Sequence, residues 1–312
     1  MATNFWQQLN KPIIALAPMA GITDSAFRLV CREYGADVVY SEMVSADGLH
    51  YNSQKTLELL NFSKKEKPLV VQLFGKHPES FVKATQAVTK AGVDGIDINF
   101  GCPAKKVFGH GSGAALMNDL DTACEIIKTV LDNTDLPVSV KCRASVKGVT
   151  ALDFVKKIKD LPVQAIMVHG RSYEQKFSGS VDYEMIKQVK KVFKGIVLAN
   201  GGIKKPKDAG VMLEKTGADG IGLAQGILGK PWLFQQIKDY LKIGDYQELD
   251  FSEIKKIALK HAKLMYKSKP DQGKFELRKH LAWYVKGEAK ASELRKKLVE
   301  TSNLEEIKEI LK

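Results

Sequence analysis

Short, nearly continuous apolar runs recur along the first 225 residues, and segments with helical periodicity separate them. Such a run is typical of a parallel strand that is covered on both faces. The intervening residues 80–92 and 153–161 repeat apolar positions every three or four residues, which predicts amphipathic helices. Gly92 indicates a helix end and Asp153 a helix start. We expect eight strands, over residues 13–18, 37–43, 69–75, 95–101, 137–143, 164–170, 195–201 and 219–225.

Eight strands that alternate with helices predict an α/β fold, a (β/α)8 TIM barrel. A doubly wound sheet is disfavoured because the first strand runs into APMAGITD, which lacks the GxGxxG pattern. The longest interval between strands follows the fourth strand. It contains the run GHGSG at residues 109–113, which we interpret as a lid near the site.

The pattern changes after Leu241, where strand signals stop and apolar residues keep helical spacing to the end of the sequence. We therefore expect two domains, a barrel over residues 1–242 and a small all-helical domain over residues 245–312. The polar, turn-rich stretch IGDYQELD joins them.

Positive charge is concentrated in the predicted helical domain. The formal net charge of the 312 residues is +12, and residues 255–297 hold 14 Lys and Arg against 4 Asp and Glu. Such a surface favours a polyanionic partner, because cations gain by releasing phosphate counterions. A generally lysine-rich surface is the alternative. Trp283 and Tyr284 lie in this stretch, where we favour helix packing over base stacking.

The cysteines and the apolar segments indicate the compartment. The four cysteines form no CxxC pair and no zinc-type spacing, so we expect no metal site and no structural disulfide. The N-terminal residues lack the pattern of a signal peptide, and no apolar stretch has the length to span a bilayer. We expect a soluble, cytoplasmic monomer that does not associate with membranes.

Polar residues stand where the predicted strands end, which is where barrel enzymes place their chemistry. A ring of buried polar groups costs desolvation unless the groups are partnered, so we predict a functional site at this rim. The polar residues concerned are Glu42, Gln72, Asp97, Asn99, Lys141, Arg143, His169, Arg171 and Asn200, and the apolar Met19 and Met43 also stand at strand ends.

Glycines after the last two strands suggest a phosphate site. NGG at 200–202 and LAQG at 223–226 offer backbone N–H groups with little side-chain obstruction, in the usual phosphate-binding position of a barrel. Plain tight turns are the alternative. Lys141 adds a cation facing the same cavity. A phosphate site beside a central cation suits flavin mononucleotide (FMN), whose N1/O2 edge becomes anionic on reduction.

Eight motifs occur in the order expected of one enzyme family. They are APMAGITDSAFR, VVYSEMVSADGL, VVQLFG, GIDINFGCPAKKV, VSVKCR, VHGRS, LANGGI and GKPWLF. In these motifs the chain resembles the tRNA-dihydrouridine synthases, and among them the bacterial B-type branch. The similarity is strong over residues 12–240 and loose in the remainder. It implies a TIM barrel that binds FMN, NADPH or alternatively NADH as reductant, and a helical domain that holds tRNA.

The same resemblance implies residue roles. Hydride would pass from flavin N5 to C6 of a uracil, and Cys102 would deliver a proton to C5, because most free thiols are protonated at neutral pH. Asn99 would hydrogen-bond the uracil and Arg143 would face the substrate. The residues implied in FMN binding are Pro18, Met19, Ala20, Gln72, Lys141, His169, Asn200, Gly201, Gly202, Ala224 and Gln225.

The chain also departs from the family pattern. Ala224-Gln225 replaces the usual Gly-Arg, whose arginine helps to bind the phosphate, so weaker FMN retention is expected. NGG stands where the B-type branch has NGD. Two other functions remain open: an FMN barrel resembling dihydroorotate dehydrogenase, which would not need the basic tail, and a non-catalytic RNA-binding protein, which would not need Cys102.

Overall fold

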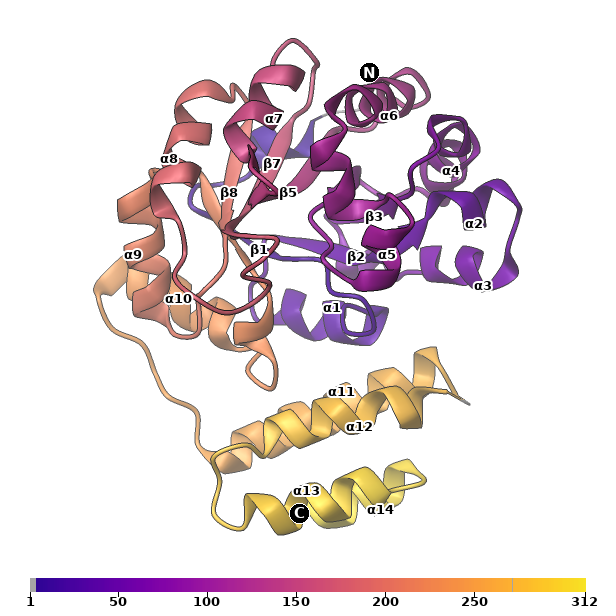
Figure 1. The fold of residues 1–312 in the computed structure, drawn as a ribbon. Coiled ribbons are helices and arrows are strands. Elements are labelled where there is room, and N and C mark those ends of the chain that lie inside the picture. The colour runs from indigo at the N-terminus through magenta and orange to yellow at the C-terminus, as the bar shows by residue number, and fades with distance from the viewer. Residues whose placement is uncertain (1–3, 271) are drawn as a thin grey trace.

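The structure, a computed structural model, describes residues 4–270 and 272–312. Eight parallel strands close into a barrel in the order β4-β3-β2-β1-β9-β8-β7-β5, and β5 pairs again with β4. The predicted TIM barrel and its eight strands are therefore confirmed (Figure 1). The barrel strands are β1 Ile13–Leu16, β2 Val38–Ser45, β3 Leu69–Phe74, β4 Gly95–Phe100, β5 Val138–Val146, β7 Ala165–Ser172, β8 Ile196–Asn200 and β9 Gly220–Leu223. The sequence pattern missed β6 (Val149–Thr150), a two-residue strand that pairs antiparallel with the end of β5.

Side chains alternate between two sides of each barrel strand, and the two sides differ in chemistry. On β4, Ile96, Ile98 and Phe100 belong to the large outer core under the helices, whereas Asp97 and Asn99 point inward. A smaller apolar cluster fills the bottom of the barrel interior, and Trp6 of the 3-10 helix η1 (Phe5–Gln8) completes it. The upper interior is consequently left to polar groups.

Eleven helices of the described chain have lengths of eight residues or more, and most begin with a side-chain cap. Gly92 ends α4 in a left-handed conformation at φ +80°, as its position predicted. The predicted start at Asp153 is wrong by three residues: Thr150 is the cap of α7, and Asp153 completes its capping box. The helices of the barrel are α1 Ser25–Glu33, α2 Ala46–His50, α3 Gln54–Leu57, α4 Pro78–Ala91, α5 Lys105–Gly109, α6 Leu120–Asp132, α7 Ala151–Ile158, α8 Tyr183–Val192, α9 Pro206–Thr216 and α10 Leu233–Ile243.

The C-terminal region is helical and lies as a layer below the barrel in Figure 1. Its helices are α11 Phe251–Ser268, α12 Gly273–Tyr284, α13 Ala291–Glu300 and α14 Leu304–Leu311. They share one apolar cluster with Ala26 and Val30 of α1 and with Trp232, so this layer is packed onto the barrel. Tyr284 is buried in the cluster, which confirms the packing interpretation for that residue.

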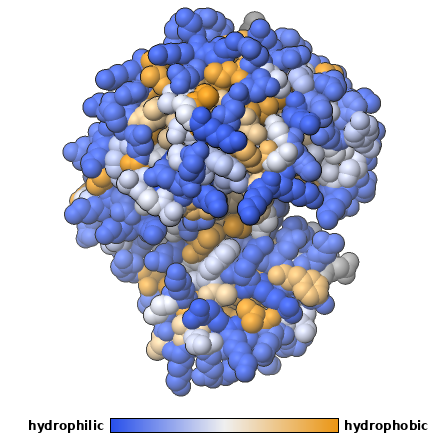
Figure 2. Space-filling model, in the orientation of Figure 1, coloured by the Kyte–Doolittle hydropathy of each residue, from blue (hydrophilic) through white to orange (hydrophobic). Residues whose placement is uncertain are grey.

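The visible surface in Figure 2 is mostly hydrophilic, and apolar side chains show in the hollow of the barrel face and where the barrel meets the helical layer. None of the helices in residues 4–270 and 272–312 combines the length and the apolar character needed to cross a bilayer.

Candidate active site

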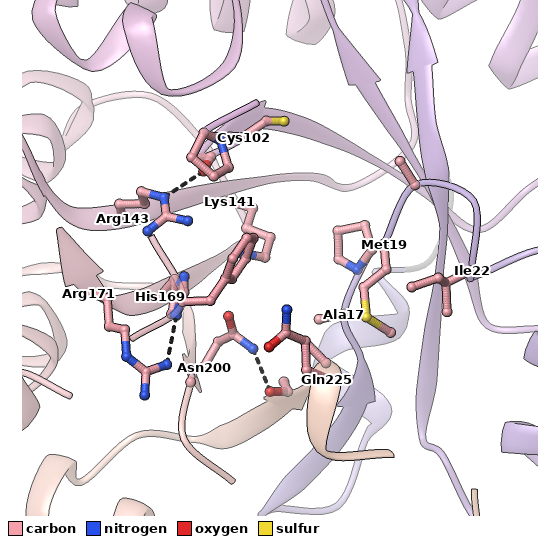
Figure 3. Close-up of a pocket in the computed structure, with 18 of the residues that line it drawn as sticks. Ala17, Met19, Ile22, Cys102, Lys141, Arg143, His169, Arg171, Asn200 and Gln225 are labelled. Carbon is pink, nitrogen blue, oxygen red and sulfur yellow. Dashed lines mark hydrogen bonds between the residues drawn. The ribbon is translucent and has the colours of Figure 1, made fainter. Parts of the chain in front are cut away.

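A cavity of about 750 Å³ opens at the carboxyl ends of the barrel strands. Every residue to which the sequence assigned a site role lines it, from Pro18 after β1 to Gln225 after β9. Met19 and Arg171 lie on opposite sides of it, and Lys141 is between them (Figure 3). Glu42 and Asp97, which also follow the polar pattern, are not among the lining residues. The volume is in the range of small-molecule sites.

The loop after β4 is held from below by Asn99. The Oδ1 atom of Asn99 accepts the backbone N–H groups of Gly101 and Cys102 at 3.0 and 2.9 Å. The carbonyl of Cys102 accepts the N–H of Ala114 at 3.2 Å. The run GHGSG, expected as a lid, thus packs against the Cys102 loop, and a Cβ at Gly113 would lie 3.1 Å from the Cβ of Cys102.

Arg143 joins this loop to the loop after β7. Its Nε donates to the carbonyl of Gly101 at 2.8 Å, and its Nη1 donates to the carbonyls of Ser172 and Lys176 at 2.8 and 2.9 Å. Arg143 is 1% exposed. Three backbone carbonyls therefore accept hydrogen bonds from two of its nitrogens, Nε and Nη1, and its third nitrogen, Nη2, donates none within the described residues.

The cavity wall is cationic. Within the described residues no carboxylate lines the cavity, whereas six cationic side chains do: Lys105, Lys141, Arg143, Arg171, Lys176 and Lys204. Burial, and then the charge of Arg143, lowers the pKa of Lys141 to about 8, and Asp97 opposes the shift. The amino group of Lys141 has no hydrogen-bond partner among the described residues, so it is available to a ligand.

His169 is neutral in this environment. Burial and the charges of Lys141, Arg143 and Arg171 lower its pKa to about 2. The Nη1 atom of Arg171 lies 3.4 Å from His169 Nε2, as the dashed line in Figure 3 shows. A guanidinium group can only donate, so Nε2 accepts and the ring proton is on Nδ1.

Glycines form a close-packed cradle on the side of β8 and β9. Gly201 and Gly202 have φ values of +115° and +75°, and a Cβ at Gly201 would lie 2.8 Å from His169 Cδ2. A Cβ at Gly226 would lie 1.8 Å from the carbonyl oxygen of Ile203. The nearest guanidinium atom of Arg171 is 3.6 Å from the Cβ position of Gly201. Bare backbone beside a cation suits a phosphate.

Two aromatic side chains at the cavity were not predicted as lining residues. Phe177, which is 56% exposed, follows Lys176, which has a φ of +53° and whose carbonyl accepts a hydrogen bond from Nη1 of the distant Arg143. Trp283 reaches the cavity from α12, because the end of that helix packs on Gly229 of the barrel. Neither position can be derived from local sequence, since each depends on contacts between distant segments.

The donor set fits FMN. The uncommitted ammonium of Lys141 suits an acceptor edge of a planar ring, and the glycine cradle with Arg171 suits a phosphate. In the described part of the chain no cluster of His, Cys, Asp and Glu has the arrangement of a metal site.

Comparison with known proteins places these features in a family. The model of the dihydrouridine synthase family matches residues 15–312. The tRNA-dihydrouridine synthase B of Vibrio vulnificus is 36% identical over 295 residues, which cover 93% of this chain and 91% of that protein. The probable tRNA-dihydrouridine synthase of Helicobacter pylori is 38% identical over 292 residues, covering 92% and 87%.

Among solved structures, the old yellow enzyme homologue of Zymomonas mobilis superposes with a TM-score of 0.55 at 12% identity. The superposition covers 75% of this chain and 90% of that one. At this identity the likeness concerns the fold alone, and it agrees with the barrel.

Proposed function

The chain belongs to the dihydrouridine synthase family, and from that premise we propose that it reduces the C5–C6 double bond of specific uridines in tRNA, with FMN bound in the cavity and NADPH as the reductant. The observation that supports this most is the convergence of Cys102, Asn99, Lys141 and the glycine cradle on one cationic cavity. A dihydroorotate-type barrel does not require the cationic helical layer, and a non-catalytic protein does not require a thiol at the rim.

The chain would hold FMN through both ends of the cofactor. The glycine turn at 201–202, with Arg171 beside it, would bind the phosphate. Lys141 would bind the N1/O2 edge of the ring, and Pro18 to Ala20 would cover the side opposite Arg171. When bound, the flavin supplies the hydride that is added to C6 of the uracil.

Cys102 would supply the proton that is added to C5. Cys102 lies on the cavity rim and is partly exposed, so a base that enters the cavity would come close to it. The hydrogen bonds that the backbone N–H groups of Gly101 and Cys102 donate to Asn99 Oδ1 fix the backbone on which the thiol is carried. The second N–H of the Asn99 amide, whose contact in the structure is the weak acceptor Met43 Sδ at 3.9 Å, and Nη2 of Arg143 would orient the uracil carbonyls. General acid catalysis of this kind contributes about 10²- to 10⁴-fold.

The helical region, residues 245–312, would bind tRNA. Its helix α12 borders the cavity: Trp283 lines it, and the Nζ of Lys279, one turn earlier, is 3.6 Å from the Cβ position of Gly21 at the rim. A uridine must leave its stack to enter the cavity, and cations around the rim would hold the flanking phosphates. The position of the target uridine depends on how this surface orients the tRNA.

Cys102→Ala tests the chemical part of the proposal. The variant is expected to keep FMN and tRNA binding and to lose dihydrouridine formation by about 10²-fold or more, because only the proton donor is removed. Cys124→Ala is the matched control, since Cys124 is also partly exposed but lies on α6 outside the cavity. Dihydrouridine is measured by mass spectrometry of tRNA from a strain that lacks the modification.

Turnover of Cys102→Ala at the wild-type rate would contradict the assignment of the proton donor. A wild-type protein that binds FMN but leaves every tRNA uridine unreduced would contradict the proposed substrate.

A further inference from the structure

Three neighbouring strands place three buried polar side chains in one row at the floor of the cavity, where Gln72 lines it and the other two lie beneath the lining. Gln72 of β3 is in register with Asp97 of β4, and Asp97 is in register with Ser139 of β5. Asp97 is 0% exposed. Of the buried carboxylates in the described chain, Asp97 alone occupies an inward position on a barrel strand.

The carboxylate of Asp97 accepts a hydrogen bond from each neighbour. Gln72 Nε2 donates to Oδ2 at 2.7 Å, and Ser139 Oγ donates to Oδ1 at 2.6 Å. An ionised carboxylate offers acceptors alone, so the amide of Gln72 must turn its NH₂ group toward Asp97. The Oε1 atom of Gln72 then faces β4 one step higher, where Asn99 Nδ2 donates to it at 2.8 Å.

The same argument applies to Asn99. Because its NH₂ group is turned toward Gln72, its Oδ1 faces the loop and accepts the N–H groups of Gly101 and Cys102. If the Gln72 amide were reversed, an oxygen would face the carboxylate and two NH₂ groups would face each other. Asp97 thereby sets a direction of hydrogen bonding that ends at the backbone of Cys102.

We propose that Asp97 is a positioning residue for Cys102, and that it acts by fixing the amide orientations of Gln72 and Asn99. This role rests on the proposed function of the same cavity. A second interpretation is that the carboxylate serves as the counter-charge of Lys141. The two interpretations predict different results for Asp97→Asn. This variant removes the charge, but its amide can still present an oxygen to Gln72 and its NH₂ group to the Ser139 hydroxyl.

The experiment separates the two half-reactions of the holoenzyme. Reduction of the flavin by NADPH does not use Cys102, whereas re-oxidation of the reduced enzyme by tRNA does. Asp97→Ala is expected to slow re-oxidation about tenfold or more, since small displacements of a reacting group have effects of this size. Its rate of flavin reduction is expected to stay within about twofold of wild type, and Asp97→Asn to stay within about threefold in both steps.

Asp219→Ala is the matched control for the loss of a buried carboxylate. Asp219 is 7% exposed, bonds Lys11, Lys190 and the N–H of Val197, and precedes β9 at the opposite end of the barrel. This variant is expected to lower the melting temperature and to leave both half-reactions unchanged. Equal slowing of both half-reactions in Asp97→Ala would indicate a merely structural role and overturn the proposal. Equal damage from Asp97→Ala and Asp97→Asn would assign the effect to charge and also overturn it.

A second readout does not depend on tRNA. The rate of Cys102 alkylation by iodoacetamide, measured by peptide mass spectrometry with Cys124 as internal reference, is expected to rise in Asp97→Ala and to stay at the wild-type value in Asp97→Asn. Gln72→Leu, which removes the hydrogen bonds of the Gln72 amide to Asp97 and Asn99, is expected to raise the alkylation rate equally. Unchanged alkylation in Asp97→Ala and Gln72→Leu would refute the positioning role, even if tRNA proved not to be the substrate.

Discussion

Replacing Asp97 by asparagine is expected to stabilise the apoprotein at neutral pH and to do so much less in acid. Burial raises the pKa of Asp97 from 3.8 to about 6, although hydrogen bonds from Gln72 and Ser139 and the charge of Lys141 oppose the shift. The folded protein therefore keeps this proton to a higher pH than the unfolded chain. The ionised carboxylate is a source of instability that asparagine lacks.

The sign and size follow from proton linkage. Between pH 3.8 and about 6 the folded state binds more protons than the unfolded state, so the free energy of unfolding decreases as the pH rises. A pKa difference of this size lowers the free energy of unfolding by about 3 kcal/mol once the carboxyl is ionised in both the folded and the unfolded state. About 2 kcal/mol of it develops between pH 4.5 and 7.5. The stability advantage of Asp97→Asn over wild type should widen by that amount, or about 3 °C in melting temperature.

The assay is urea unfolding of both apoproteins at pH 4.5 and 7.5. Asp219→Asn is the control with the opposite sign. Burial alone would raise the pKa of Asp219 as well, but hydrogen bonds from Lys11, Lys190 and the N–H of Val197 have the larger effect and lower it. Asp219→Asn should therefore lose stability by nearly the same amount at both pH values, because the contribution of a carboxyl with a lowered pKa is lost only as the pH falls below 3.8. An Asp97→Asn advantage that stays constant, or that is larger at pH 4.5, would refute the reasoning about Asp97.

Three further predictions concern other parts of the molecule. Burial lowers the pKa of His280 well below 6.5, so the unfolded chain binds more protons than the folded protein, and the free energy of unfolding falls as the pH drops from 7 to 5. His280→Leu should reduce that fall in urea titrations, and an unchanged fall would contradict the prediction. Gly201→Ala should weaken FMN binding about tenfold or more, because the new Cβ would meet His169 and the backbone φ at this position is positive. An affinity equal to that of the wild type in a fluorescence titration would contradict the assignment of the glycine cradle to FMN. Lys279→Gln should weaken tRNA binding and reduce the salt dependence of the affinity by about one phosphate contact. Lys308→Gln, which replaces a lysine paired with Glu305, should change neither. Equal salt slopes for Lys279→Gln and the wild type would exclude α12 from the interface.

The barrel could be predicted from the sequence because its signals are local. Continuous apolar runs such as residues 13–16 mark buried strands, and Gly92 marks a helix end whatever surrounds it. The start of α7 was misplaced because Asp153 suits either the cap position or the third helical position. The two-residue β6 is too short to carry a periodic pattern.

The candidate site could be predicted in part, since strand ends of a closed barrel meet at one rim and the polar residues there could be read from the sequence. The missing parts depend on long-range contacts. Trp283 reaches the cavity because α12 packs on Gly229, and Arg143 is held by carbonyls of the loop that carries Phe177. The part played by Asp97 depends on the direction of hydrogen bonds across three strands, which residue types alone do not specify.

The central claim is that a flavin and the Cys102 thiol act together on a uridine drawn into the cationic cavity. The most direct measurement takes the purified protein with FMN and NADPH, adds tRNA that lacks dihydrouridine, and records NADPH consumption together with dihydrouridine by mass spectrometry. The account predicts a yellow protein and one dihydrouridine formed at a defined position for each NADPH consumed. A protein that stays colourless when FMN is supplied, or that reduces free pyrimidines but leaves the tRNA unchanged, would contradict it.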